Sequence, residues 1–381
     1  MRVRCAHHGP VEPRQGWRGG VTEHEETLMS GNTGVTRRTM LKAGAGAMVG
    51  VTFFGAPRLG AMAQDKPIRI AFIQGVIGDN FYITMDCGAQ AKATELGNIT
   101  VETQGPEQFD QTLQTPILNA VIQTKPDAIM MAPNDVKGMI APIQAAIDAG
   151  IPVLCVDTTI DSDIQIADVS TDNTEGGRLA ARGLAEALGG KGKVMVVNTK
   201  PGISTTDQRG AGFKEEIAKY PDIAFVGEEF CDNDANKAAA IVSAKLQSDP
   251  DLNGVFGTNL FSAQGAAAGV REQGKTGVVK VVGFDAGPQQ VQDLKSEVVD
   301  MLIAQHPGEI GEVAVQLIHD YLTNGSVDPK KYVTGATIVT RDNLESPEAQ
   351  QALYVADCGA YSLTGAKPSP AEAAAEATPS A

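Results

Sequence analysis

Short apolar runs rich in Val and Ile alternate with longer amphipathic stretches in the first half of the chain. The short runs predict strands, and the longer stretches, whose apolar positions follow a helical period, predict helices. The predicted strands are 68–73, 99–104, 128–133 and 151–157, and the predicted helices are 81–96, 112–123 and 136–149. This alternation predicts a parallel sheet covered by helices on both faces.

A second series of the same kind begins near residue 175. Its predicted strands are 193–199, 223–229, 254–258 and 278–285, and its predicted helices are 175–188, 205–219, 236–246, 262–273 and 289–296. A strand-like run at 298–305, a helix at 308–322 and a last strand at 336–340 follow. The chain is therefore predicted to be an α/β protein with two doubly wound parallel-sheet domains.

Polar residues stand directly after several of the predicted strands. They carry carboxylates, amides and hydroxyls: Asp157, Thr158, Thr159, Asn198, Thr199, Asn259 and Asp285. Ligands of doubly wound sheets bind beyond the carboxyl ends of the strands. We therefore expect the binding site at these strand ends, where the two sheets face a common cleft.

The N-terminal part of the chain has the order of an export leader. Residues 36–42, TRRTMLK, precede a weakly apolar, glycine-rich run and the small residues Ala61-Met62-Ala63. The paired arginines are typical of a twin-arginine signal, although Met40 stands where an aromatic is common. The apolar run is shorter than the roughly 20 residues of a spanning helix. We expect cleavage after Ala63, which makes 1–63 an extension and leader, and a soluble protein in the periplasm.

The two ends of the chain set the limits of the folded part. Residues 1–28 fit no leader pattern, so a start at Met1 or at Met29 stays open. Residues 366–381 consist mainly of Ala, Pro, Ser and Glu, and they lack the apolar side chains that offset ordering entropy, so a disordered tail is predicted. The net charge of -15 argues against nucleic acid or an anionic membrane as a partner.

Cysteine and histidine offer little metal or catalytic chemistry. The cysteines after the leader show no C-x-x-C or zinc-type spacing: Cys87, Cys155, Cys231 and Cys358. An exported protein could form a disulfide between two of these cysteines, and the sequence does not say which two. Cys155 lies in the apolar run IPVLCV and is more simply explained as a small core residue. His306 and His319 are the only histidines after the leader. No metal and no cofactor are predicted.

Five motifs, in this order, carry a family resemblance. They are DNFYITMDCGAQ at 79–90, STDNTEGG at 170–177, QRGAGF at 208–213, VVGFDAGP at 281–288 and IAQHPGEIG at 303–311. With them the chain resembles the periplasmic sugar-binding proteins of ABC importers, of the ribose-binding type, over about residues 66–345.

The resemblance implies a type I periplasmic binding protein with two lobes. The expected N-terminal lobe is 66–170 with 306–335, and the expected C-terminal lobe is 171–305 with 336–365. A three-segment hinge is expected near residues 170–172, 305–307 and 334–336, and closure about it would enclose the ligand.

The resemblance also implies ligand contacts in both lobes. Phe81 and Tyr82 match an aromatic pair that stacks on the sugar, although both would also suit a buried helix start. Asp157 and Asp285 match carboxylates that accept hydrogen bonds from sugar hydroxyls, with helix capping or a surface turn as the alternative.

Amide contacts follow the same resemblance. Asn259 and Gln305 match amides that donate and accept at once, and for Asn259 a turn-forming role is the alternative.

The departures from the family pattern bear on the ligand. Thr158 and Asp207 stand where ribose binders carry arginines, and Arg209 matches a neighbouring arginine expected to brace the loop. Asn233 falls where an aromatic would sit, and Asp79 replaces an asparagine. The pocket is therefore expected to be more acidic, with fewer donors. A polyol, another small sugar and a cationic ligand are favoured over ribose, in that order.

The expected function is capture of a small sugar or polyol for an ABC importer, without catalysis. The expected partners are a membrane permease with its ATPase, and a monomer is the simplest state. One alternative is a sensor-type binding protein that feeds a chemoreceptor or signalling system. Another is an exported sugar-active enzyme using an acidic pair among Asp157, Asp207 and Asp285.

Overall fold

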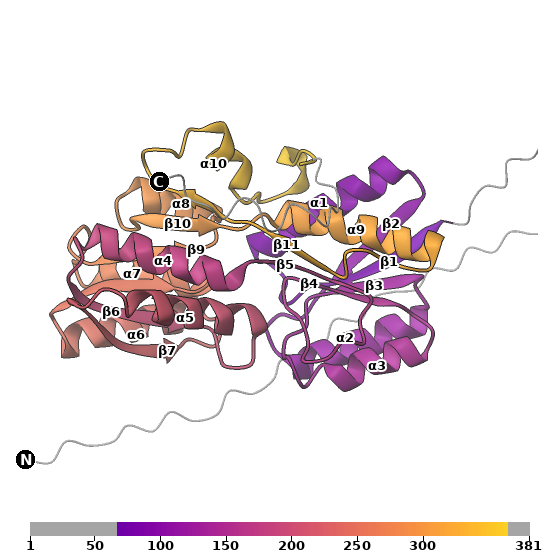
Figure 1. The fold of residues 1–381 in the computed structure, drawn as a ribbon, viewed down its shortest axis with the longest axis horizontal. Coiled ribbons are helices and arrows are strands. Elements are labelled where there is room, and N and C mark those ends of the chain that lie inside the picture. The colour runs from indigo at the N-terminus through magenta and orange to yellow at the C-terminus, as the bar shows by residue number, and fades with distance from the viewer. Residues whose placement is uncertain (1–66, 365–381) are drawn as a thin grey trace, which may run out of the picture. The chain divides into compact units, whose positions relative to one another are not determined.

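The computed structural model describes residues 67–364, which form two α/β lobes, each built on a six-stranded sheet (Figure 1). The predicted α/β fold with two doubly wound sheets is confirmed. The predicted leader and tail lie outside the described residues. The limits predicted for the lobes stay predictions, and we define each lobe by its sheet.

The sheet of lobe 1 is parallel throughout. Its strands, in spatial order, are β11 (Lys331–Thr334), β5 (Asp168–Thr171), β4 (Val153–Val156), β3 (Ala128–Met131), β1 (Ile68–Ile73) and β2 (Ile99–Gln104). β5 and β11 are absent from the strands predicted above. Both are four residues long, and β11 buries only Thr334, so neither shows the apolar run that marks an interior strand.

The sheet of lobe 2 has the same strand number and one reversed edge. Its strands, in spatial order, are β12 (Thr337–Val339), β10 (Met301–Ala304), β9 (Lys280–Phe284), β8 (Leu252–Gly257), β6 (Gly192–Asn198) and β7 (Ile223–Phe230). Its neighbours run parallel except at the edge, where β12 pairs antiparallel with β10.

Helices cover both faces of each sheet. In lobe 1, α1 (Asn80–Leu96) and α9 (Pro307–Asn324) lie on one face, with α2 (Gln111–Thr124) and α3 (Ile140–Asp148) on the other. In lobe 2, α4 (Asn173–Ala187) and α5 (Ser204–Ile217) lie opposite α6 (Ala235–Ser248), α7 (Leu260–Glu272) and α8 (Pro288–Lys295). The short α10 (Pro347–Ala352), which was not predicted, packs beside β12.

The chain crosses between the lobes at the three predicted segments, after β5, β10 and β11. Side chains from the three crossings are joined by hydrogen bonds. The Thr171 hydroxyl donates to Gln305 Oε1 at 2.8 Å and lies 3.3 Å from the Thr334 hydroxyl. The three crossings are therefore linked by hydrogen bonds, so movement of one segment displaces the other two.

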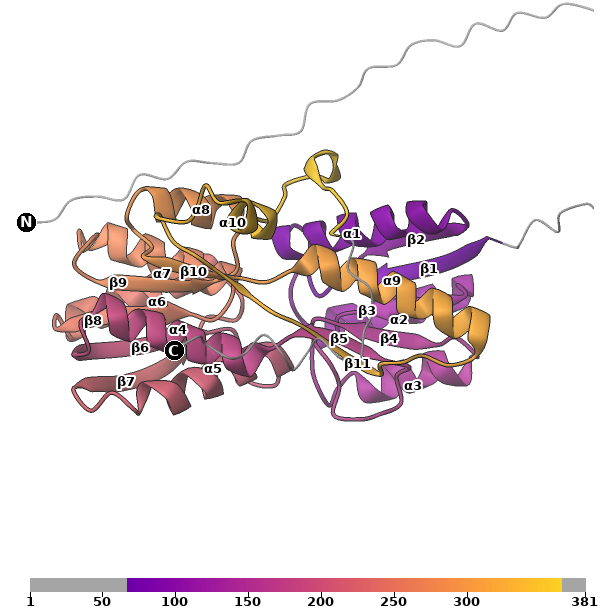
Figure 2. The same ribbon diagram turned by 45° about the horizontal axis from the view of Figure 1, so that its top comes forward.

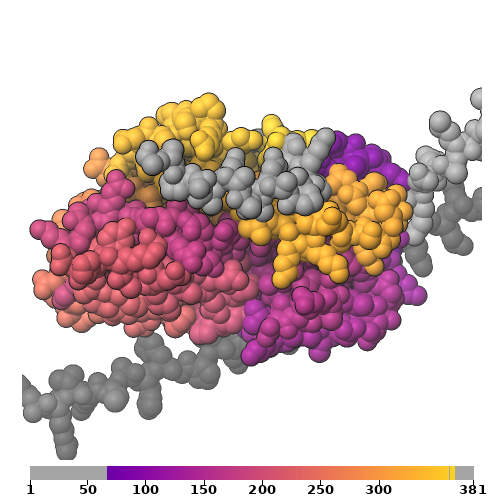
Figure 3. Space-filling model, in the orientation of Figure 1, coloured from indigo at the N-terminus to yellow at the C-terminus, as the bar shows by residue number. Residues whose placement is uncertain are grey.

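A further passage between the lobes, which the sequence did not predict, comes after α10. We call residues 353–364 the C-terminal strap; Figures 2 and 3 show this segment in yellow, running from lobe 2 towards α1. The Tyr354 N–H donates to the Ala286 carbonyl in lobe 2. The next residue, Val355, contacts α1 of lobe 1: its N–H donates to the Thr84 hydroxyl, and its carbonyl accepts from Asn80 Nδ2.

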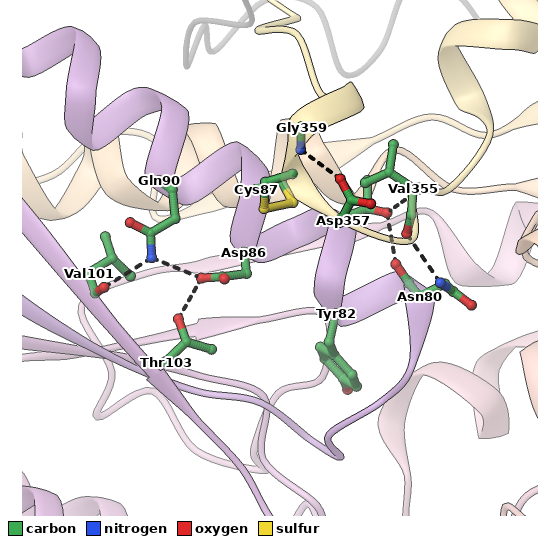
Figure 4. Close-up of a disulfide and its surroundings, with 12 residues drawn as sticks. Asn80, Tyr82, Asp86, Cys87, Gln90, Val101, Thr103, Val355, Asp357 and Gly359 are labelled. Atoms are coloured by element: carbon green, nitrogen blue, oxygen red, sulfur yellow. Dashed lines mark hydrogen bonds between the residues drawn. A yellow bond between two sulfur atoms is a disulfide. The ribbon is translucent and has the colours of Figure 1, made fainter.

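A disulfide fixes the strap to lobe 1. Cys358 in the strap is bonded to Cys87 in α1 (Figure 4), and Cys155 and Cys231 are buried and free. Beyond the disulfide, the Glu312 carboxylate in α9 accepts hydrogen bonds from the Tyr361 hydroxyl and the Thr364 N–H. The pairing that the sequence left open is therefore Cys87 with Cys358.

Two glycines let α1 and α9 approach closely. A Cβ on Gly88 would lie 2.1 Å from the Gly308 carbonyl oxygen, and a Cβ on Gly311 would lie 2.0 Å from the Met85 carbonyl oxygen. Backbone on both sides leaves no room for a side chain. The contact sets the relative position of the N-terminal ends of α1 and α9, and both ends lie next to predicted site residues.

We predict that Gly311→Ala lowers the free energy of unfolding by about 1–3 kcal/mol, because overpacking forces the two helices apart. The matched control is Gly183→Ala in α4, where the added Cβ meets only the flexible end of Met301. In Gly183→Ala the gain in helix propensity, about 1 kcal/mol, offsets the cost of moving the Met301 side chain. Urea unfolding of both variants measures the difference; equal effects would contradict the role of the α1–α9 contact.

Candidate ligand-binding site

A cavity of about 40 Å³ lies where the two lobes meet. Lobe 1 contributes Asp79, Phe81, Tyr82, Phe109 and Asp157 to its lining. Lobe 2 contributes Thr199, Ile203, Thr205, Thr206, Arg209, Asn233, Asn259 and Asp285, and Gln305 comes from the crossing after β10. Among the predicted site residues, Thr158 and Asp207 do not line the cavity.

The start of α1 presents two aromatic rings to the cavity. Asp79 is the N-cap of α1, and its carboxylate accepts the Phe81 N–H at 2.9 Å. Phe81 and Tyr82 are both buried, and their rings meet edge to face at 5.1 Å between centroids. The rings belong to the core and also form a wall of the cavity, and their stacking on a sugar stays a prediction.

The two lobes place an aspartate in equivalent positions. Asp157 follows β4 and Asp285 follows β9, both with positive φ, at 59° and 78°. Each N–H donates to the neighbouring strand at 2.8 Å, to Val169 and Ile303 respectively. Left-handed backbone is tolerated by Asp better than by most residues. The strand thus ends at the aspartate, and its carboxylate lies at the sheet edge that faces the other lobe.

A tyrosine hydroxyl binds each of these carboxylates. Tyr82 donates to Asp157 Oδ2 and Tyr354 donates to Asp285 Oδ1, both at 2.8 Å. Asp285 also accepts Gln305 Nε2 at 2.7 Å and the Leu260 N–H at 2.6 Å. Gln305 therefore links the Asp285 carboxylate to the crossings through its bond with Thr171.

Arg209 supplies a cationic donor to the cavity. It is 2% exposed; its Nε donates to Asn173 Oδ1, its Nη1 donates to the Thr258 carbonyl, and its guanidinium lies 3.8 Å from the centroid of the Phe284 ring. Within residues 67–364, its Nη2 has no hydrogen-bond partner. Arg209 therefore holds neighbouring segments together and also lines the cavity, so the expectation that the pocket has fewer donors than a ribose pocket is corrected by one buried guanidinium.

The helical period of α5 places Arg209 at the cavity and Asp207 away from it, which is the reverse of the assignment from the family pattern. Thr205, Thr206 and Arg209 are buried on one face of α5, whereas Asp207 is exposed on another face and accepts the Gly202 N–H. Residues three and four apart share a helix face, and that spacing was the available signal. Phe109 and Ile203, in loops, gave no comparable signal.

Among the remaining predicted residues, Asn259 and Asn233 have structural partners, whereas the Thr158 hydroxyl has none within residues 67–364. Asn259 is the N-cap of α7: its Oδ1 accepts the Ser262 N–H at 3.1 Å, and its Nδ2 donates to Asn233 Oδ1 at 2.6 Å. Asn259 is therefore both the helix cap and part of the cavity wall. Thr158 is buried beside Asp157, and its hydroxyl has no hydrogen-bond partner within the described part of the chain.

The buried carboxylates differ from ordinary aspartates in their proton affinity. Burial, followed by the charge of Asp285, raises the pKa of Asp79 to about 7. Burial also raises the pKa of Asp157 to about 6, against the lowering effects of the Arg209 charge and the Tyr82 hydrogen bond. Desolvation disfavours the charged form, and a nearby cation favours it. The protonation of the cavity therefore changes near neutral pH.

The cavity is small because the lobes meet at their rims. Lys200 Nζ donates to the Phe109 carbonyl at 2.8 Å, and the Val136 N–H donates to the Gly202 carbonyl at 3.1 Å. Small-molecule sites commonly measure about 300–1,000 Å³, so a ligand must gain space through movement of lobes or side chains. A second cavity of about 1050 Å³ lies between the strap and the start of α9, and it does not include Asp79, Asp157 or Asp285.

The chain was compared with known proteins. A model of the periplasmic binding protein domain matches residues 70–326. A D-ribose/D-allose-binding protein of Pseudomonas aeruginosa is 32% identical over 236 residues, which cover 59% of this chain and 72% of that protein. A ribose import binding protein of Bacillus subtilis is 29% identical over 261 residues, which cover 68% of this chain and 83% of that protein.

A solved structure gives a higher identity. The solute-binding protein of an ABC transporter from Agrobacterium vitis, bound with α-D-tagatopyranose, is 46% identical with a TM-score of 0.74. The match covers 76% of this chain and 99% of that chain.

We predict that ligand-free protein loses stability as the pH rises from about 4 to about 7. The pKa values of Asp79 and Asp157 are raised in the folded state above the unfolded value of about 3.9, so the folded state binds more protons in this window. A tenfold difference in proton affinity between the folded and unfolded states corresponds to about 1.4 kcal/mol. Asp79→Asn keeps an N-cap acceptor but cannot ionise, so its free energy of unfolding should fall less over this range.

The matched control is Asp110→Asn, at the N-cap of α2. Hydrogen bonds from Thr112 lower the pKa of Asp110, so this carboxylate contributes nothing to a loss of stability between pH 4 and 7. Urea unfolding at several pH values gives the three curves. A curve for Asp79→Asn that runs parallel to the wild type would contradict the assignment.

Proposed function

Because the chain belongs to the periplasmic binding protein domain family, we propose that it is the solute-binding component of an ABC importer and captures a monosaccharide between its lobes. One observation carries the proposal: carboxylates from both lobes, Asp157 and Asp285, line the same cavity as Arg209, whose Nη2 has no hydrogen-bond partner among the described residues. A ligand that both donates and accepts hydrogen bonds satisfies this arrangement, and a sugar hydroxyl does both.

The other lining groups support a sugar as the ligand. Ionised carboxylates form strong hydrogen bonds with hydroxyl donors, and the amides of Asn259 and Gln305 donate and accept at the same time. Phe81 offers an apolar ring to the C–H groups of a sugar. Arg209 restores the donor whose expected absence had favoured a polyol, so monosaccharides now come before polyols and before cationic ligands.

The identity of the sugar is proposed from the comparisons. The Agrobacterium vitis protein that is 46% identical was solved with a tagatopyranose, and a protein of Agrobacterium radiobacter, 28% identical with a TM-score of 0.72, was solved with D-arabinose. We take D-tagatose as the first ligand to test, followed by D-ribose, D-allose and D-arabinose, and by D-fucose, with which a second Agrobacterium vitis solute-binding protein, 27% identical, was solved.

Ligand binding and transport are coupled through closure of the lobes. A sugar bound by both Asp157 and Asp285 stabilises the closed form, which a permease with its ATPase would recognise. Changing a 1:99 equilibrium to 99:1 requires about 5.5 kcal/mol of differential affinity. Two or three charge-assisted hydrogen bonds formed only in the closed state supply this amount, at about 1.5–3 kcal/mol each.

We propose a periplasmic location, supported by family membership and by the leader-like pattern of residues 36–63. Members of this family are periplasmic binding proteins, and export by the twin-arginine route is proposed from residues 36–42. Within the described residues, no helix combines the length and apolar character needed to cross a bilayer. We further propose a monomer that binds its sugar without transforming it.

The first test is a thermal-shift screen of the protein from Gln64 onward with the five sugars, several pentitols and hexitols, and cationic amines. Binding raises the melting temperature by mass action. We expect a clear shift with at least one monosaccharide. The absence of any shift, after unfolding and refolding to remove carried ligand, would reject the proposal.

The second test is Asp157→Asn, compared with Asp207→Asn outside the cavity. Loss of one charge-assisted hydrogen bond weakens binding about 10- to 100-fold. The Asn amide oxygen still accepts from Tyr82, so the ligand-free melting temperature should not fall. Calorimetric Kd values that are equal in the two variants would exclude Asp157 as a ligand contact.

A further inference from the structure

The Asp285 carboxylate is held by a residue from outside the two sheets. Tyr354 lies in the C-terminal strap, 69 residues beyond Asp285, and is 4% exposed. Its hydroxyl accepts the Gln305 N–H at 3.1 Å and donates to Asp285 Oδ1 at 2.8 Å. Because the hydroxyl oxygen already accepts from the backbone, its proton is directed at the carboxylate.

This arrangement repeats the one in lobe 1. Tyr82 from α1 donates to Asp157, and Tyr354 from the strap donates to Asp285, at the same 2.8 Å. The Phe81 ring packs against both tyrosine rings, with its centroid 5.1 Å from that of Tyr82 and 5.9 Å from that of Tyr354. Lobe 1 obtains its tyrosine from its own helix, whereas lobe 2 depends on the strap for the equivalent group.

The strap is attached to both lobes at this point. The Tyr354 N–H binds Ala286 in lobe 2, and Val355 binds Thr84 and Asn80 in α1. The disulfide between Cys87 and Cys358 keeps this end of the strap on α1, as Figure 4 shows. Tyr354 therefore lies on a covalently closed connection between the lobes, next to the ligand cavity.

We propose that Tyr354 is a positioning residue of the ligand site, which orients Asp285 so that this carboxylate accepts one ligand hydroxyl. The inference rests on the proposed sugar-binding function. A carboxylate has about four acceptor positions, and within residues 67–364 Leu260, Gln305 and Tyr354 occupy three of those on Asp285. One position remains for the ligand. Burial, together with the charge of Asp285, raises the pKa of Tyr354, so the hydroxyl stays a donor.

The test compares Tyr354→Phe with Tyr361→Phe. Both changes remove one phenol oxygen from the strap, but the Tyr361 hydroxyl binds Glu312 in α9 and does not reach the cavity. Kd is measured by calorimetry with D-tagatose, or with whichever sugar of the panel shifts the wild type most. We expect Tyr354→Phe to weaken binding about tenfold and Tyr361→Phe to leave Kd unchanged.

Deoxy analogues of the same sugar give a readout that a purely structural role would not change. In the wild type, removing the hydroxyl that meets Asp285 should weaken binding more than removing the others. In Tyr354→Phe this preference should shrink, because Asp285 loses one of the three donors that orient it, while the preferences at other hydroxyls stay the same. An unchanged preference pattern would overturn the assignment even if Kd rose.

A double variant, Cys87→Ser with Cys358→Ser, tests the strap separately. It keeps the Tyr354 hydroxyl but removes the crosslink, so we expect an affinity between those of the wild type and Tyr354→Phe. An affinity below that of Tyr354→Phe would show that the strap acts through other groups, and would overturn the role of Tyr354.

The failures are distinguishable. If the wild type binds no sugar of the panel, the proposed function fails and the inference falls with it. If the wild type binds a sugar and Tyr354→Phe behaves like Tyr361→Phe, the inference alone fails.

Discussion

The burial of ionisable aspartates at the meeting point of two lobes is the constraint on which the rest of this structure depends. A carboxylate removed from water is costly unless donors replace the lost hydration. Here the donors are a tyrosine hydroxyl for Asp157 and a tyrosine, an amide and a backbone N–H for Asp285. Those donors come from distant parts of the chain, so the site is stable only when the lobes, the crossings and the strap are all in place.

The doubly wound fold positions these aspartates through the strands that they end and the neighbouring strands that they bond. In each lobe a buried parallel strand ends, the backbone turns into the left-handed region at Asp157 or Asp285, and the carboxylate is left at the sheet edge. The N-terminal ends of helices contribute further polar side chains to the cavity. Asp79 caps α1 and Asn259 caps α7, and both line the cavity. Secondary structure and binding chemistry therefore use the same side chains.

Features that depend on local sequence patterns could be predicted, and features that depend on long-range contacts could not. The two sheets and the aspartates at strand ends follow from apolar periodicity and strand order, both of which are local properties. The position of Arg209 in the cavity lining is predictable from its helical spacing to Thr205 and Thr206, although the family pattern assigned it to bracing a loop. The strap does not follow, because the contact between Cys87 and Cys358 spans 271 residues and no local pattern marks it. β5 and β11 were missed because short, half-exposed strands carry almost no apolar signal.

The position of the strap in the sequence has a consequence for the order in which the molecule is assembled. Both sheets and the crossings after β5, β10 and β11 are complete by Val339, but Tyr354 and Cys358 come later in the chain. Ribosomal synthesis proceeds from the N-terminus, so a nascent chain can form both lobes before the residue that orients Asp285 has been made. A shortened chain that ends before the strap would keep the architecture and lose the completed site.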